Sequence, residues 1–234
     1  MFFKDKLQNK IKEIKNSIVA IGFNPNPNQI TIIGSGFAVS NDGKILSGAH
    51  LYNQLNSEQI SNLKANVMIE QMENDLERYR WIPIKLINKD DKNDIAIFQL
   101  QEYKETLLRK LDLGDSEKVE IGQKVYFIGF PYAAQLMNEG FGVTLVVNKG
   151  IISNIKRDGV DPEHKRNWLI VDAISNPGNS GCPLVDIETN KVIGVMTIAF
   201  RTKSQTVQNL DIREPMHIAG ARPINLAKPL LNNL

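Results

Sequence analysis

The fold and the chemistry of this chain are best read from residues 176–183, which spell Asn176-Pro177-Gly178-Asn179-Ser180-Gly181-Cys182-Pro183. Ser180 stands in a glycine-rich tight turn between two apolar segments. Glycines on both sides allow backbone conformations closed to other residues and let a substrate carbonyl approach closely. They also leave main-chain N–H groups free to point at that carbonyl oxygen, as in an oxyanion hole. Ser180 is therefore a candidate nucleophile that still requires a base and an orienting acid.

A histidine that could act as the base lies upstream, after a predicted hairpin. The turn Asn41-Asp42-Gly43 separates two apolar segments, and Asp-Gly in that position is a strong hairpin signal. His50 follows the second segment, directly after the small pair Gly48-Ala49. The two other histidines, His164 and His217, lie in polar or irregular stretches, and we interpret them as solvated or structural. His50 is therefore the predicted base, placed at the end of a strand.

An aspartate that could orient this histidine opens the largely apolar segment 94–100. A carboxylate at the mouth of a strand can be buried against a histidine, where it fixes the tautomer and stabilises the imidazolium. A solvated loop is the plain alternative for Asp94 and the acidic residues before it. A calcium loop is disfavoured because the regular Asp-x-Asp-x-Asp-Gly spacing and a closing glutamate are missing. Each of the three segments alone is weak evidence for a Ser-His-Asp arrangement. The occurrence of His50, Asp94 and Ser180 in this order and in these contexts is strong evidence for it.

Composition narrows the class of protein. The chain has 234 residues, of which 42% are hydrophobic, and a net charge of +2, so we expect a sizeable core and find no case for nucleic-acid binding. The single cysteine, Cys182, argues against a disulfide-stapled secreted enzyme and is a poor basis for a metal site. The start of the chain has no signal-peptide pattern, and no apolar run reaches the length of a membrane span. These features predict a cytoplasmic location.

Short strands separated by turn signals dominate the chain, which predicts a barrel or a sandwich. Residues 3–16 have apolar side chains at helical spacing and are predicted to form an amphipathic helix that packs on the barrel. The segment 223–234 is predicted as a terminal helix, although Pro229 fits poorly inside it. The loop 132–144 contains glycines beside Phe141, which suits a gate near the cleft or, equally, an ordinary surface loop. The predicted strands are 18–23, 29–39, 44–47, 65–71, 80–87, 94–100, 124–129, 143–156, 168–173, 183–186, 191–200 and 216–221.

These segments resemble the trypsin-like fold, and most closely the bacterial high-temperature-requirement (HtrA/Deg) branch of it. The resemblance covers roughly residues 17–234 and implies an all-β fold of two antiparallel six-stranded β-barrels with the active site in the cleft between them. The implied domains are an N-terminal helix (1–16), a first barrel (17–112) and a second barrel with a C-terminal helix (113–234). The matching motifs are Gly34-Ser35-Gly36-Phe37, Ala49-His50, Asp94-Ile95-Ala96-Ile97 and Gly178-Asn179-Ser180-Gly181, with further matches at 113–116, 128–131, 150–153 and 222–227.

The resemblance implies a serine endopeptidase that needs no cofactor or metal. Ser180 would attack a peptide carbonyl, His50 would take and return the proton, and Asp94 would orient His50. The N–H groups of Gly178 and Ser180 would hold the oxyanion. The hydroxyl of Thr197 would support the aspartate.

The same resemblance implies a specificity pocket with Ile198 and Ala199 as one wall, beside Thr197, and with Ile174 near the floor. No acid stands at that floor, so cleavage after Lys or Arg is disfavoured. We expect a small or medium aliphatic residue on the acyl side of the cleaved bond. The implied partners are a protein or peptide substrate and a regulatory protein.

Three features depart from the family pattern. Cys182 replaces a glycine, and we interpret it as a small buried hydrophobe. Asn179 stands where digestive enzymes of the fold carry an aspartate that pairs with a new N-terminus, so that activation is not expected. The chain ends at Leu234 without the PDZ domain that usually follows, so control is expected from loops, the N-terminal segment or another chain. Two alternatives stay open: a catalytically silent binding module of this fold, and a partner-activated protease that cleaves one dedicated protein.

Overall fold

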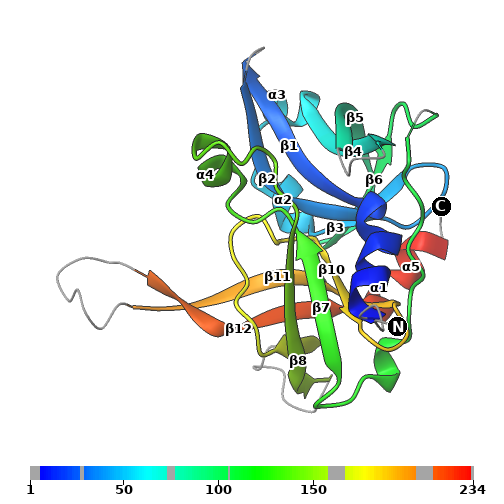
Figure 1. The fold of residues 1–234 in the computed structure, drawn as a ribbon, viewed down its shortest axis with the longest axis vertical. Coiled ribbons are helices and arrows are strands. Elements are labelled where there is room, and N and C mark those ends of the chain that lie inside the picture. Colours follow the sequence, from blue (N-terminus) through cyan, green and yellow to red (C-terminus); the bar gives the residue numbers. More distant parts are fainter. Residues whose placement is uncertain are drawn as a thin grey trace.

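The computed structural model describes residues 6–26, 29–72, 77–104, 106–157, 167–203 and 213–232. The first residues of the predicted N-terminal helix and His164 lie outside these ranges. The described strands form two closed antiparallel barrels, with strand orders β1-β2-β3-β6-β5-β4 and β10-β11-β12-β9-β8-β7 (Figure 1). The predicted fold class, two antiparallel six-stranded barrels, is therefore confirmed.

In the first barrel, residues 18–23 and 95–98 are buried at consecutive positions, whereas residues 82–90 alternate between more buried and more exposed positions. The predicted turn at residues 41–43 joins two of them, β2 and β3, and Gly43 supplies the positive φ of +88° that the turn requires. The strands are β1 (Ile18–Asn26), β2 (Gln29–Ala38), β3 (Lys44–Ser47), β4 (Leu63–Gln71), β5 (Glu77–Asp90) and β6 (Ile95–Leu100).

The second barrel has the same closure, and two of its strands are longer than the sequence predicts. The β11–β12 pair continues as an exposed two-stranded arm away from the barrel body (Figure 1), since Arg201 still pairs with Pro215 and Lys203 with Arg213. The strands are β7 (Lys124–Gly129), β8 (Val146–Lys156), β9 (Trp168–Val171), β10 (Pro183–Asp186), β11 (Val192–Lys203) and β12 (Arg213–Pro223).

Helices lie at both ends of the described chain and between the strands. The predicted terminal helix is shorter than expected, because a 3₁₀ turn occupies Ile224–Leu226 first. Pro229 then falls in the first turn of α5, where a missing N–H removes no helical hydrogen bond. None of the described helices is long and apolar enough to cross a membrane. The helices are α1 (Lys6–Ile14), α2 (Ala49–Asn53), α3 (Ser57–Ser61), α4 (Ala133–Asn138) and α5 (Lys228–Asn232), with 3₁₀ turns at Lys15–Ser17, Ser116–Lys118 and Ile224–Leu226.

One apolar cluster joins the two barrels. It contains Phe37 and Leu46 of the first barrel, Phe130 next to the second, and Ile14 of α1. Leu7 and Ile11 of α1 and Leu230 of α5 pack on the same cluster, so the amphipathic helix covers the barrels as predicted. Two further clusters fill the barrel interiors. Because the cluster contains residues of both barrels, it holds β2 and β3 beside the turn that precedes β10. The candidate site lies at this turn.

Candidate active site

His50 and Asp94 are in direct contact. The ring Nδ1 of His50 lies 2.8 Å from Oδ2 and 3.0 Å from Oδ1 of Asp94. The backbone N–H of His50 also donates to Oδ1, at 2.7 Å. The carboxylate therefore holds both the ring and the main chain of the histidine, while 37% of the His50 side chain remains exposed. The ring can thus be oriented from one side and still face a reactant on the other.

The local structure around His50 differs from the sequence prediction. His50 is not at a strand end but at the second position of the short helix α2, whose N-cap is Gly48 in an extended conformation. Ala49 and Leu51 are buried beside it, so a single turn of helix is anchored on the barrel and presents His50 toward Asp94. The preceding strand β3 stops at Ser47.

Asp94 lies in a turn directly before β6, rather than in the strand that was predicted to start with it. Its φ is +56°, a left-handed conformation that aspartate and asparagine tolerate better than most residues. Strained conformations of this kind persist where the surroundings determine them. The three contacts with His50 are such a determinant.

The turn that contains Ser180 is packed so tightly that it requires its glycines. Gly178 has a φ of +100°, and a Cβ there would lie 2.2 Å from the carbonyl oxygen of Phe130. Gly181 has a φ of +86°, and a Cβ there would lie 2.1 Å from Ser47 Oγ and 3.1 Å from the Gly48 nitrogen. The turn therefore lies against the residues that lead into α2, which brings Ser180 to the His50 side of the cleft. The hydrogen bonds within the described ranges include none between Ser180 and the His50 ring.

The backbone N–H groups of this turn divide into two sets. Those of Asn179, Gly181 and Cys182 donate to the carbonyls of Asn176, Met196 and Asn179, at 3.0, 2.7 and 3.0 Å. Those of Gly178 and Ser180 find no acceptor among the residues that the structure describes. Both residues are partly exposed, so two neighbouring donors are left for a group that enters from the cleft. These are the two donors predicted from the sequence, and their role as an oxyanion hole stays a prediction.

The predicted specificity residues are only partly brought together. Ile198 and Ala199 follow one another on β11 and are half-buried, as is Ile174. Neither the hydrogen bonds nor the core clusters of the described residues link Ile174 to them, so the pocket stays a prediction. Thr197 is 8% exposed, and its hydroxyl has no hydrogen-bond partner within the described ranges. The expected support of Asp94 by this hydroxyl is thus absent from the described contacts.

Asn179 and Cys182 both point into the protein. Cys182 is fully buried, and burial raises the pKa of its thiol well above the usual range, which fits a small buried hydrophobe and not a reactive group. Asn179 is also fully buried, and neither amide atom is paired with a described residue. The N-terminal helix α1 contacts the turn after β10 through Lys10, whose Nζ donates to the Glu188 carbonyl at 2.6 Å.

Two contacts near the site were not predicted from the sequence, although Tyr132 opens the loop 132–144 and Arg222 opens the matching segment 222–227. Tyr132 has a φ of +48° at the start of α4, and its N–H donates to the Pro177 carbonyl at 2.8 Å, so the 132–144 loop contacts the turn of Ser180. Arg222 of β12 stacks on the Trp168 ring at 3.8 Å and is attracted by the charge of Asp94. Only backbone geometry and strand register create these contacts, so the sequence pattern carries no signal for them.

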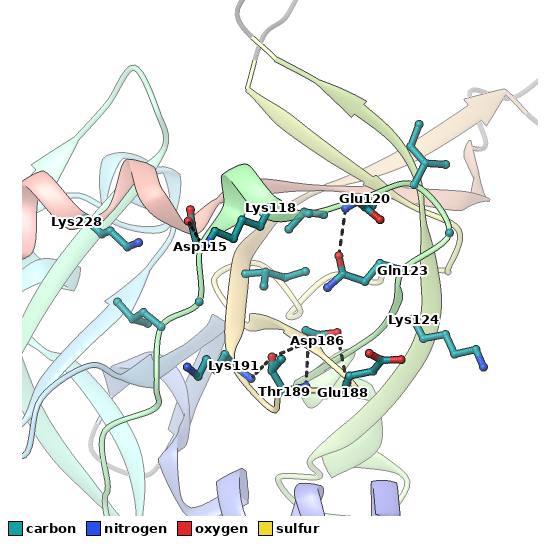
Figure 2. Close-up of a pocket in the computed structure, with 16 residues that line it drawn as sticks. Asp115, Lys118, Glu120, Gln123, Lys124, Asp186, Glu188, Thr189, Lys191 and Lys228 are labelled. Carbon is teal, nitrogen blue, oxygen red and sulfur yellow. Dashed lines mark hydrogen bonds and ion pairs between the residues drawn. The ribbon is translucent and has the colours of Figure 1, made fainter.

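A cavity of about 920 Å³ lies elsewhere, between the segment 113–124 and the β10–β11 turn (Figure 2). It contains none of the predicted site residues. Two of its acidic groups are engaged, since Asp186 accepts from the N–H and hydroxyl of Thr189 at 2.9 and 2.5 Å, and Asp115 accepts from Asn225 at 2.7 Å. The described residues contain no group of acidic, histidine or cysteine side chains that could hold a metal ion. The candidate catalytic residues lie outside this cavity.

The fold and the site together define a class of protein. The trypsin-like peptidase domain matches residues 34–195, and the chain belongs to this family. Among curated relatives, a probable periplasmic DegP-like serine endoprotease of Halomonas elongata is 31% identical over 80% of this chain and 33% of that protein. A second DegP-like protein, from Buchnera aphidicola subsp. Schizaphis graminum, is 33% identical over 74% of this chain and 32% of that protein. Periplasmic serine endoprotease DegP of Salmonella typhimurium is 30% identical over 74% of this chain and 35% of that protein.

These comparisons agree with the predicted resemblance to the HtrA/Deg branch, which is confirmed at the level of the family. The chain spans about one third of the length of the curated relatives it matches. The relatives are named as periplasmic proteins, so the cytoplasmic location expected from the N-terminal sequence finds no support among them.

Proposed function

We propose that this chain is a serine endopeptidase that hydrolyses peptide bonds through an acyl-enzyme intermediate on Ser180. The observation that carries the proposal is that the Asp94 carboxylate binds both the ring Nδ1 and the backbone N–H of His50. The nearby glycine turn also has two N–H groups, those of Gly178 and Ser180, without an acceptor among the described residues. Membership of a peptidase family and similarity to proteins named serine endoproteases add independent support.

In this proposal the three residues act in the order of a Ser-His-Asp triad. Ser180 Oγ attacks the substrate carbonyl carbon while Nε2 of His50 takes its proton. Asp94 accepts a hydrogen bond from Nδ1–H, which keeps Nε2 as the acceptor and stabilises the imidazolium. The carbonyl oxygen becomes an oxyanion held by the N–H groups of Gly178 and Ser180. The imidazolium then protonates the leaving amine, and water repeats the sequence on the acyl-enzyme.

The largest single contribution is assigned to the oxyanion donors. Removing one such donor costs about 3 kcal/mol of transition-state stabilisation in other serine proteases. Neither donor has an acceptor among the described residues, so within that part of the chain no hydrogen bond has to break when the oxyanion forms. This preorganisation is the physical reason for placing the chemistry at the turn.

For the substrate we propose a protein or peptide with a small or medium aliphatic residue before the cleaved bond. The residues that would line the pocket, Ile174, Ile198 and Ala199, carry no charge and are half-buried. An apolar pocket without an acid offers no partner for the cation of Lys or Arg. Digestion of a mixed peptide library by the purified chain tests this preference, and frequent cleavage after Lys or Arg would overturn it.

Digestion of an unfolded protein such as casein tests the proposed activity itself. Ser180→Ala should abolish cleavage, whereas Ser153→Ala should retain it, because the Ser153 hydroxyl only donates to the Ile170 carbonyl within the barrel wall. Both variants should give the circular dichroism spectrum of the wild type. Cleavage that survives Ser180→Ala would remove Ser180 as the nucleophile.

A second form of the proposal is a protease activated by a partner and restricted to one protein. It is favoured by the contact between the Tyr132 N–H and the Pro177 carbonyl, because a partner that moves the 132–144 loop would also move the turn of Ser180. In this case the isolated chain leaves casein intact, and cleavage appears only when a binding protein is added. A silent binding module predicts no cleavage under either condition.

A further inference from the structure

Ser35 lies at the centre of the contacts that hold the turn of Ser180. It is a residue of β2 in the first barrel, and none of its surface is exposed. Its hydroxyl donates to the Gly178 carbonyl at 2.6 Å and accepts from the Phe130 N–H at 2.9 Å. Its own N–H donates to the Ser180 carbonyl at 2.8 Å. One buried side chain thus connects β2, the end of β7 and the nucleophile turn.

The two carbonyls that Ser35 binds flank Asn179. The carbonyl of Gly178 belongs to the peptide before Asn179, and the carbonyl of Ser180 belongs to the peptide that leaves the turn. Asn179 itself has no side-chain partner among the described residues, so it does not hold the turn with its amide. The hydroxyl of Ser35 is the side-chain group that fixes the Gly178 carbonyl.

Fixing this carbonyl matters because Gly178 can rotate more easily than other residues. Glycine populates both signs of φ, so the peptides around it can turn over when nothing holds their carbonyls. The Pro177 carbonyl is held by the Tyr132 N–H, and the Gly178 carbonyl by Ser35. The N–H of Gly178 belongs to the peptide whose carbonyl the Tyr132 N–H holds, and the N–H of Ser180 belongs to the peptide whose carbonyl accepts from the Cys182 N–H. The Ser35 hydroxyl holds the peptide between these two, so it limits rotation of the segment that sets the direction of one donor relative to the other.

We propose that Ser35 is a positioning residue, whose hydroxyl holds the Gly178–Ser180 turn with both unpaired N–H groups directed at the reacting carbonyl. It acts through the turn and does not touch the substrate. The inference rests on the proposed function, since it assigns a residue that supports the same oxyanion hole. It extends that function by giving β2 of the first barrel a direct part in holding the turn of Ser180, which precedes β10 of the second barrel.

The test compares Ser35→Ala with Ser116→Ala. Both remove one fully buried serine hydroxyl. Ser116 Oγ accepts from the Asn225 N–H at 3.1 Å, away from the turn of Ser180, whereas Ser35 Oγ makes two hydrogen bonds. A thermal melt of each variant measures its loss of stability, and the kinetics are compared below both melting temperatures. Reaction with a fluorophosphonate is followed at several concentrations, which separates the maximal rate constant kinact from the half-saturating concentration KI.

Ser35→Ala should lower kinact by roughly 10- to 100-fold, below the loss for a deleted oxyanion donor, and should change KI by less than about twofold. Ser116→Ala should leave both constants within about twofold of the wild type. The pH at which reactivity falls to half on the acid side should be the same in all three proteins, because the His50–Asp94 contact is untouched. Equal kinact values for Ser35→Ala and Ser116→Ala would overturn the assignment.

A crystal structure of Ser35→Ala gives a readout that does not depend on activity. The carbonyl of Gly178 should point in a new direction or occupy two directions, while the His50–Asp94 contact is retained. An unchanged turn in Ser35→Ala would overturn the inference even if the wild type proved inert. A changed turn in an inert protein would uphold the positioning role and count against the proposed function alone.

Discussion

Asp94 binds the backbone and the ring of one histidine with a single carboxylate. One oxygen accepts the His50 N–H at 2.7 Å, and the other lies 2.8 Å from the ring Nδ1. The left-handed backbone at Asp94 sets this arrangement, in which 21% of its side chain is exposed. In the proposed mechanism Asp94 controls the tautomer of His50, which requires a carboxylate that is charged and carries no proton.

Replacement of Asp94 by asparagine should therefore lower the rate of peptide hydrolysis without unfolding the chain. An amide facing Nδ1 favours the tautomer with the proton on the wrong nitrogen, and the same change in another serine protease lowers kcat by about 10⁴. Asp91→Asn is the matched control, since Asp91 is an exposed residue of the same turn that pairs with Lys89. Steady-state kinetics on a peptide substrate measures both. Equal rates for the two variants would contradict the role of Asp94.

At the scale of elements, short apolar segments separated by turn signals predicted most strands near their observed positions. The short helix at His50 was missed, since one turn has no periodicity to detect and depends on burying Ala49 and Leu51. The positive φ of Asp94 and the contacts of Ser35 and Tyr132 depend on segments far apart in the chain. Motifs thus predicted the candidate residues, but they did not predict the backbone conformations and long-range contacts that hold those residues in place.

The turn of Ser180 requires glycine for two separate reasons, backbone conformation and space. Gly181→Ala should cost roughly 3 kcal/mol or more of unfolding free energy, because it adds a clash with the Ser35 carbonyl and Ser47 Oγ to the strain of a positive φ. Gly122→Ala isolates the strain, since Gly122 has a φ of +91° with open space around it, and should cost about 1 kcal/mol. Urea unfolding measures both. Equal costs would show that the turn can relax around a Cβ.

The turn between β10 and β11 should give the chain a pH-dependent contribution to stability. Burial raises the pKa of Asp186, but hydrogen bonds from Gln123 and Thr189 outweigh it and hold this pKa below its ordinary value. A lowered folded-state pKa means that the stabilisation is present above the unfolded-state pKa and is lost as the pH falls through the folded one.

Asp186→Asn should therefore be less stable than the wild type by about 1–2 kcal/mol at neutral pH, as for a buried charged hydrogen bond. This difference should shrink as the pH falls below about 4. Urea unfolding of both proteins between pH 3 and 7 measures it. A difference that stays constant or grows toward acid would contradict the role assigned to Asp186.

At the scale of the whole molecule, the two barrels and both terminal helices share one apolar cluster. The expected division of the chain at residues 112 and 113 remains a prediction, and the shared cluster indicates that the halves do not unfold separately. The chain has two tryptophans, with Trp81 on β5 of the first barrel and Trp168 on β9 of the second. The fluorescence of each tryptophan can therefore follow the unfolding of the barrel in which it lies.

Single-tryptophan variants, Trp81→Phe and Trp168→Phe, should each unfold in one transition. In each variant the urea midpoint from the remaining tryptophan's fluorescence should match the midpoint from far-ultraviolet circular dichroism, because loss of one barrel exposes the cluster on which the other depends. A fluorescence midpoint that precedes the circular dichroism midpoint in either variant would contradict this coupling.

Fluorophosphonate labelling read by intact mass tests whether Ser180 is the activated nucleophile that we propose. A hydroxyl without a base and an oxyanion hole reacts negligibly with this reagent, whereas one activated by His50 and the turn reacts readily. We expect one added phosphonyl group on the wild type and none on Ser180→Ala. Labelling that persists in Ser180→Ala, or no labelling of the folded wild type with or without a binding protein, would contradict it.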